Sequence, residues 1–196
     1  MKTIIFSIVL SFLISVNAAA QNQDCLSPTP PMGWNSWNWH GKQAVDEALI
    51  METMDAMVES GLRDAGYEYV VIDGGWRDTK LGAKGELLAH PDKFPNGMKP
   101  LADYAHSKGL KFGLHTVPGT HDCGGDAVGG LGREEIHIQQ FVDWGIDFVK
   151  VDKCKYVLDE NLDAPGGDKR WKAGWEDENN VEAVYRKWSE LLKNSG

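Results

Sequence analysis

The segment Gly145-Ile146-Asp147-Phe148-Val149-Lys150-Val151-Asp152-Lys153-Cys154 decides the fold class of this chain. It predicts a short apolar strand over 148–152 that ends on an acid with a lysine on either side. An acid at the C-terminal end of a buried parallel strand occupies the position where α/β barrels carry reactive side chains. Neighbouring cations favour the ionised form of such a carboxyl group. Asp152 is therefore the first candidate for a chemical role.

Three further candidate strands precede this one, and candidate helices alternate with all four. The strands are predicted within 29–37, 67–73, 110–115 and 148–152, and the helices over 46–65, 98–108, 134–144 and 178–193. Strands that alternate with helices indicate βαβ units and a parallel sheet. The strand ends at Trp37, Asp73, His115 and Asp152 are 36, 42 and 37 residues apart. Each interval fits one βα unit with an enlarged loop, so the four units are half of a (β/α)8 barrel or a small doubly wound domain.

The N-terminus has the pattern of a signal peptide. Lys2 gives a positive start, residues 4–16 are almost continuously apolar, and Ala18-Ala19-Ala20 offers a cleavage site. The apolar run is short for a membrane span, although an anchoring helix is the alternative interpretation. We expect residues 1–20 to be removed and the protein to be secreted or periplasmic.

Charge and cysteine content narrow the possible partners. Residues 21–196 hold 19 basic against 29 acidic side chains, a net charge of −10. Such an acidic protein is poorly suited to bind nucleic acid or an anionic membrane, whereas a neutral sugar is compatible with it. Three cysteines allow at most one internal disulfide, which an oxidising compartment would permit.

Four blocks of sequence resemble glycoside hydrolase family 27, the α-galactosidase family. They are Pro30-Pro31-Met32-Gly33-Trp34-Asn35-Ser36-Trp37, Val71-Ile72-Asp73-Gly74-Gly75-Trp76, Lys111-Phe112-Gly113-Leu114-His115 through Cys123, and Val149-Lys150-Val151-Asp152-Lys153-Cys154. The resemblance implies a (β/α)8 TIM barrel and a retaining mechanism. We therefore expect 21–196 to be the N-terminal half of a catalytic barrel, with about the first four βα units, and the intact protein to continue beyond Gly196.

The resemblance also implies roles for individual residues. Asp152 matches the nucleophile that forms a covalent glycosyl-enzyme; on the sequence alone, a structural acid paired with Lys150 or Lys153 is an equal alternative. The positions that match sugar-binding residues are Trp37, Asp73, Trp76, His115 and Lys150. The implied ligand is a carbohydrate with a terminal α-linked sugar.

Two positions depart from the family pattern. Gly74 stands where the family commonly has a second acid, and His115 stands where it often has tyrosine. A related α-glycosidase or a β-L-arabinopyranosidase is therefore an alternative to α-galactosidase. Cys123 and Cys154 match the family pair that forms a disulfide, which leaves Cys25 without an internal partner.

The general acid/base that retaining hydrolysis needs is absent from the matched blocks. In the family it lies on a later strand, so we expect it beyond Gly196 and expect this fragment alone to be inactive. A zinc hydrolase built on His115, His121, Asp122 and Cys123 is a weaker alternative, because no second ligand pair is spaced to complete it. A non-catalytic carbohydrate-binding protein is a further alternative. No metal or organic cofactor is implied, and the oligomeric state is not predicted.

Overall fold

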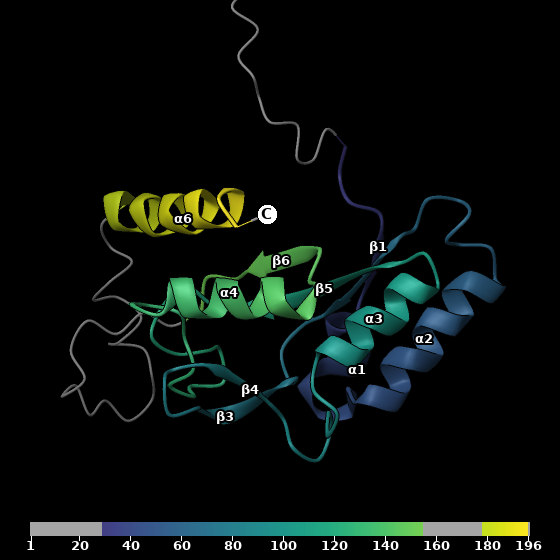
Figure 1. Cartoon of the computed structure of the whole chain (residues 1–196), viewed down its shortest axis with the longest axis horizontal. Helices are drawn as coiled ribbons and strands as arrows, with labels where there is room; N and C mark the ends of the chain where they lie inside the picture. Colours follow the sequence, from purple (N-terminus) through teal and green to yellow (C-terminus); the bar gives the residue numbers. More distant parts are fainter. Residues whose placement is uncertain (1–28, 155–177, 196) are drawn as a thin grey trace, which may run out of the picture. The chain divides into compact units, whose positions relative to one another are not determined.

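The computed structural model describes residues 29–154 and 178–195 (Figure 1). The chain divides into two units, Met1–Pro30 and Pro31–Gly196, and all elements named below belong to the second. The predicted signal peptide and Cys25 lie outside the described residues, so both stay predictions. No helix within the described ranges is long and apolar enough to cross a membrane.

Four parallel strands form the main sheet, as the alternation of elements predicted. They are β1 (Gly33–Asn35), β2 (Tyr69–Ile72), β5 (Lys111–Thr116) and β6 (Phe148–Val151), and their order in the sheet is β1-β2-β5-β6. Neighbouring strands follow one another in the chain except for a small hairpin between β2 and β5. This is the order of successive strands in a β/α barrel, of which the described chain covers a part.

The predicted helices are also present. They are α2 (Glu47–Glu59), α3 (Lys99–Ser107), α4 (Glu134–Trp144) and α6 (Glu178–Lys193). The bounds of α4 and α6 agree with the prediction, and α4 ends where Gly145 takes a left-handed conformation with φ of 73°. Helix α2 ends six residues early, because the chain turns from Ser60 onward through Gly61, whose φ is +78°.

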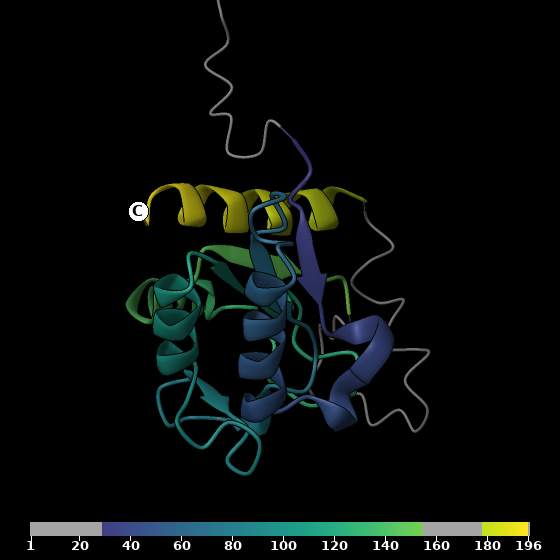
Figure 2. The same cartoon turned by 90° about the vertical axis from the view of Figure 1, so that its right-hand side faces the viewer.

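The core lies between one face of the sheet and the helices, as the two views of the molecule show (Figures 1 and 2). Alternate residues of a strand point to opposite faces, and one set in β2 and β5 is apolar and fully buried. That set is Val70, Ile72, Phe112 and Leu114, and it packs with helix residues such as Ile50, Met54, Leu101, Ala105 and Phe141. Because this apolar face is buried against the helices, the remaining side chains of the same strands point to the opposite face of the sheet.

Three elements were missed by the sequence interpretation. Helix α1 (Trp37–Ala44) begins directly after β1, and the antiparallel pair β3 (Arg77–Leu81) and β4 (Leu87–Ala89) lies in what was expected to be a loop. No residue of α1 is buried and Gly41 breaks its helical geometry, so it lacks an apolar stripe. Strand β3 is polar, which hides its strand character.

The second face of the sheet carries the other set of strand residues. Near the middle of the strands, a cavity of about 230 Å³ lies on this face; its lining includes Trp34, Asn35, Tyr69, Phe148 and Lys150. The polar residues of interest follow at the C-terminal ends of the same strands.

Candidate active site

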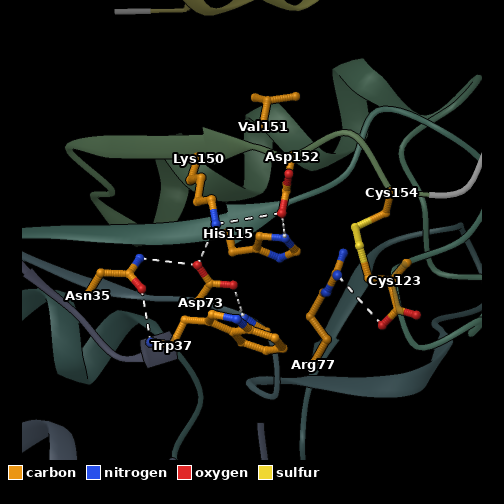
Figure 3. Close-up of polar contacts among 12 residues, drawn as sticks. Asn35, Trp37, Asp73, Arg77, His115, Cys123, Lys150, Val151, Asp152 and Cys154 are labelled. Carbon is orange, nitrogen blue, oxygen red and sulfur yellow. Dashed lines mark hydrogen bonds and ion pairs between the residues drawn. A yellow bond between two sulfur atoms is a disulfide. The ribbon is translucent and has the colours of Figure 1, made fainter. Parts of the chain in front are cut away.

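Parallel register places three polar residues in one row across the sheet. Ile72 pairs with Leu114, and His115 pairs with Lys150. Asp73, directly after β2, therefore stands in one row with His115 on β5 and Lys150 on β6. Asp152 follows two residues after Lys150 and so points to the same face. Figure 3 shows these side chains converging at the strand ends. The structure thus brings together four residues that are far apart in sequence.

Asp73 is the most firmly held of the four. Its side chain is nearly buried and accepts hydrogen bonds from Lys150 Nζ at 2.6 Å, Asn35 Nδ2 at 3.2 Å and the Gly74 N–H at 2.8 Å. Burial by itself would raise the pKa of Asp73, but the hydrogen bond from Lys150 and the other contacts outweigh it and hold the pKa below its ordinary value. Asp73 is therefore an ionised acceptor fixed in one orientation.

Lys150 connects the two carboxylates of the site. Its Nζ lies 2.6 Å from Asp73 Oδ2 and 3.6 Å from Asp152 Oδ2. Burial alone would lower the pKa of Lys150, but the hydrogen bond and charge of Asp73, with the charge of Asp152, raise it above its ordinary value. The ammonium group stays charged at neutral pH and offers its remaining hydrogen-bonding capacity to a bound hydroxyl.

Asp152 is the more open carboxylate. It lies just beyond the end of β6, its N–H donates to Thr116 O at 2.8 Å, and its side chain is 38% exposed. Among the described residues, His115 Nε2 at 3.4 Å and Lys150 Nζ at 3.6 Å both approach Oδ2. The carboxylate is held from one side and is open to solvent, which suits a group that must meet a substrate.

His115 contacts Asp152 through its imidazole ring: Nε2 lies 3.4 Å from Oδ2. Its imidazole is buried, and burial, with the nearby charge of Arg77, lowers the pKa of His115 to about 4. At neutral pH the ring is therefore neutral, so its contact with Asp152 at 3.4 Å is not an ion pair.

Trp76 is a correction to the predicted site. The sequence comparison within the family implied that it lines the sugar pocket, but its side chain is completely buried. Its Nε1–H donates to His115 O at 2.9 Å, and its ring packs edge-on against Trp144. The turn at Gly75, with φ of +106°, directs the indole into the core. Trp76 therefore holds the backbone of His115 and has no face open to a sugar.

Trp37, in contrast, is half-exposed beside the row. Its N–H donates to Asn35 Oδ1 at 2.9 Å, and its ring lies against Gly74, where an added Cβ would be 3.3 Å from Cζ3. An exposed aromatic face next to hydrogen-bonding carboxylates is a suitable surface for a sugar ring. The absence of a side chain at Gly74 is what leaves room for this position of the indole.

A disulfide joins Cys123 to Cys154, as predicted. It ties the loop after β5 to the residue that comes two positions after Asp152. Among the residues that the structure describes, one group could hold a metal ion by position: His115, Asp152 and Cys154, with ligand atoms within 4.8 Å of one another. The sulfur of Cys154 is committed to the disulfide, so this group does not form a thiolate site.

Three residues of the site were not nominated from the sequence. Asn35 donates to Asp73, Ser36 Oγ accepts from the Asp73 N–H at 3.0 Å, and Arg77 lies buried next to His115 (Figure 3). Asn35 and Ser36 belong to the first of the four blocks that resemble the family. Polar residues at the end of a predicted strand could have identified them as site residues. Nothing in the sequence marks Arg77 as buried.

Comparison with known proteins agrees with this geometry. A sequence profile of the family described as "Alpha galactosidase A" matches residues 29–174. This chain belongs to that family. The α-galactosidase of Coffea arabica is 47% identical over 129 residues, which are 66% of this chain and 34% of that protein. The range 29–174 that the family profile matches contains all the site residues described above.

Solved structures share the fold. The structure of α-galactosidase I from Mortierella vinacea has a TM-score of 0.74 and 38% identity, and the match covers 89% of this chain and 40% of that one. An α-galactosidase from Saccharomyces cerevisiae with raffinose has a TM-score of 0.73 and 32% identity, with 86% and 33% covered. The chain spans about a third of the length of the curated relatives that it matches.

Proposed function

We propose that this chain carries the nucleophile and part of the sugar-binding site of a retaining α-galactosidase, an enzyme that hydrolyses terminal α-linked galactose. The observation that carries the proposal is the position of Asp152: a half-open carboxylate at a strand end, supported on Oδ2 by His115 and Lys150 and next to the fixed acceptor Asp73. The family of the chain and its named relatives support the same reaction.

In the proposed chemistry, Asp152 is the nucleophile and Asp73 binds the sugar. Because the contacts of Asp152 fall on Oδ2, Oδ1 attacks the anomeric carbon while the bond to the leaving oxygen breaks and that oxygen takes a proton from a general acid. Water then releases the sugar from the glycosyl-enzyme. Asp73 and Lys150 bind sugar hydroxyls and fix the ring, and Trp37 packs against its apolar face.

Asp73 is a poor general acid in this arrangement. It is nearly buried, and its contacts with Lys150, Asn35 and the Gly74 N–H favour the ionised form. The proposal therefore still places the acid/base beyond Gly196, in the part of the barrel that the relatives have and this sequence does not cover.

We also propose that the protein is exported from the cytoplasm. The expected signal peptide in 1–20 would deliver the chain to an oxidising compartment, and the disulfide between Cys123 and Cys154 is suited to such a compartment. We propose a secreted or periplasmic enzyme whose partner is an oligosaccharide such as raffinose.

Hydrolysis by the full-length gene product tests the function. An aryl α-galactoside is compared with the matching α-glucoside and β-L-arabinopyranoside, with Asp152→Asn as the control. The proposal expects turnover of the galactoside that is lost in the variant. Turnover of another sugar with the same dependence on Asp152 would assign a different substrate, and no turnover of any of them would favour a carbohydrate-binding protein.

A further inference from the structure

Two buried nitrogens behind the site lack hydrogen-bond partners among the described residues. They are Nδ1 of His115 and Nη1 of Arg77. The Arg77 side chain is only 4% exposed, and its nearest acidic oxygen, Oδ2 of Asp122, lies 3.9 Å from Nη2. Figure 3 shows the guanidinium beside the imidazole, on the side away from Lys150. An unpaired buried polar atom is destabilising, so two of them next to a candidate nucleophile need an explanation.

The charges of these groups are well defined at neutral pH. Burial lowers the pKa of Arg77 to about 10, while the charges of Asp122, Asp126 and Asp73 act in the opposite direction. The guanidinium therefore remains a cation. The imidazole of His115 is neutral, since its pKa is about 4, and so it carries one N–H on either Nδ1 or Nε2.

The surroundings distinguish the two tautomers. With the proton on Nε2, the N–H points toward Oδ2 of Asp152, 3.4 Å away, and the lone pair of Nδ1 lies near the guanidinium cation that Figure 3 shows beside the ring. With the proton on Nδ1, the Nε2 lone pair would face Oδ2 of Asp152 at 3.4 Å, and the N–H would face a positive charge. Both contacts favour the first form, because like charges and like dipoles repel at short range in a buried site.

We propose that Arg77 is a positioning residue that holds His115 in the Nε2–H tautomer, so that the imidazole donates to Oδ2 of Asp152 and leaves Oδ1 for attack. The Arg77 side chain is buried, and in this proposal it acts on Asp152 through His115. The role in attack rests on the proposed function, whereas the tautomer itself does not.

The other charged groups around His115 do not replace this role. Asp73 after β2 and Asp152 after β6 favour a protonated ring, while Lys150 on β6 acts with Arg77 against it. Lys150 lies on the Asp73 and Asp152 side of the ring, since its ammonium group contacts both carboxylates. Arg77 is the cation on the opposite side of the ring, as Figure 3 shows.

Nitrogen NMR of His115 tests the proposal in the full-length protein labelled with ¹⁵N-histidine. The His115 signals are assigned by their loss in His115→Asn. We expect a protonated-type signal for Nε2 and an unprotonated-type signal for Nδ1 at neutral pH. A protonated Nδ1 in the wild type would overturn the proposal without any variant and whatever the activity, so a failed substrate panel leaves this result interpretable.

Arg77→Met and the matched Arg77→Lys separate charge from packing. Loss of the cation should raise the pKa of His115 and populate both tautomers, while lysine should preserve the wild-type signals. Identical signals in Arg77→Met and wild type would contradict the proposal. If Arg77→Met does not fold, Asp122→Asn serves instead: it leaves the cation less compensated and should lower the pKa of His115 further, and a rise would contradict the proposal.

Discussion

The two faces of strands β2, β5 and β6 differ in every respect that matters for this protein. On one face, Val70, Ile72, Phe112 and Leu114 are fully buried beneath the helices and contribute packing. On the other face, at the ends of the same strands, Asp73, His115 and Lys150 form a charged row next to Asp152. The two sets alternate along each strand, so residues one position apart point to opposite faces. Burial of the apolar face therefore fixes the direction of the polar side chains, and both carboxylates are the first residues after their strands.

The largest effect should come from the polar face at Asp152. Asp152→Ala in the full-length protein should lower turnover of an aryl α-galactoside by about 1000-fold or more, because the covalent nucleophile is gone. Azide fits the vacated space and should restore turnover in part, with a β-galactosyl azide as the product. The anomeric configuration of that product is read by NMR. Unchanged turnover in Asp152→Ala would show that the carboxylate is structural.

The apolar face should respond in stability instead. Phe112 is completely buried, so Phe112→Ala should lower the free energy of unfolding by about 3–5 kcal/mol. Trp37→Ala, on a half-exposed ring of the other face, should cost about 1 kcal/mol or less. Urea unfolding measures both. Equal losses would remove the distinction between the two faces.

A smaller and pH-dependent effect is expected at Lys150. Asp73 has a lowered pKa in the folded protein, so its contribution to stability is present above the ordinary pKa of about 4 and is lost as the pH falls through the folded value. Lys150→Met leaves burial as the dominant influence, which raises that pKa. We expect a loss of about 1–3 kcal/mol at pH 7.

Thermal unfolding of the wild type and Lys150→Met between pH 7 and pH 3 measures this effect. The difference in melting temperature should be largest at pH 7 and should shrink toward pH 4, because protonation relieves the unpaired carboxylate in the variant. Lys80→Met, at an exposed lysine of β3, is the matched control. A difference that grows as the pH falls would have the wrong sign for this account.

The smallest effect is expected at Gly74. A Cβ there would lie 3.3 Å from Trp37 Cζ3, so Gly74→Ala should move the indole by a few tenths of an ångström and change stability by less than about 1 kcal/mol. The adjacent Gly75→Ala is the contrast, since φ is +106° and the Cβ would lie 2.6 Å from Lys42 O. Its cost should be about 1–3 kcal/mol. Equal unfolding free energies for the two variants would contradict this description of the turn.

The sequence predicted the parts of the fold that depend on repeated local signals. The parallel order, the bounds of α4 and its end at Gly145 were correct, because apolar periodicity and a left-handed glycine are visible in the residues themselves. Helix α1 was missed because none of its residues is buried. The direction of Trp76 depends on a turn at Gly75 that the sequence does not reveal.

The site was predicted in part for a related reason. Asp73 and Asp152 are the first residues after β2 and β6, and His115 and Lys150 are the last but one of β5 and β6. Parallel strands bring these C-terminal ends together. Arg77 comes just after a turn, and only the packing of β3 beneath the site buries it next to His115. Contacts that arise from the tertiary arrangement of loops and hairpins have no local pattern by which to find them.

The central claim is that Asp152 forms the covalent intermediate. The most direct test is to incubate the full-length protein with a fluorinated α-galactosyl fluoride, whose glycosyl-enzyme is hydrolysed slowly, and to map the labelled peptide by mass spectrometry. The account predicts one added fluorosugar on Asp152 and none in Asp152→Asn. Label on another carboxylate, or turnover of α-galactoside with no label at Asp152, would contradict it.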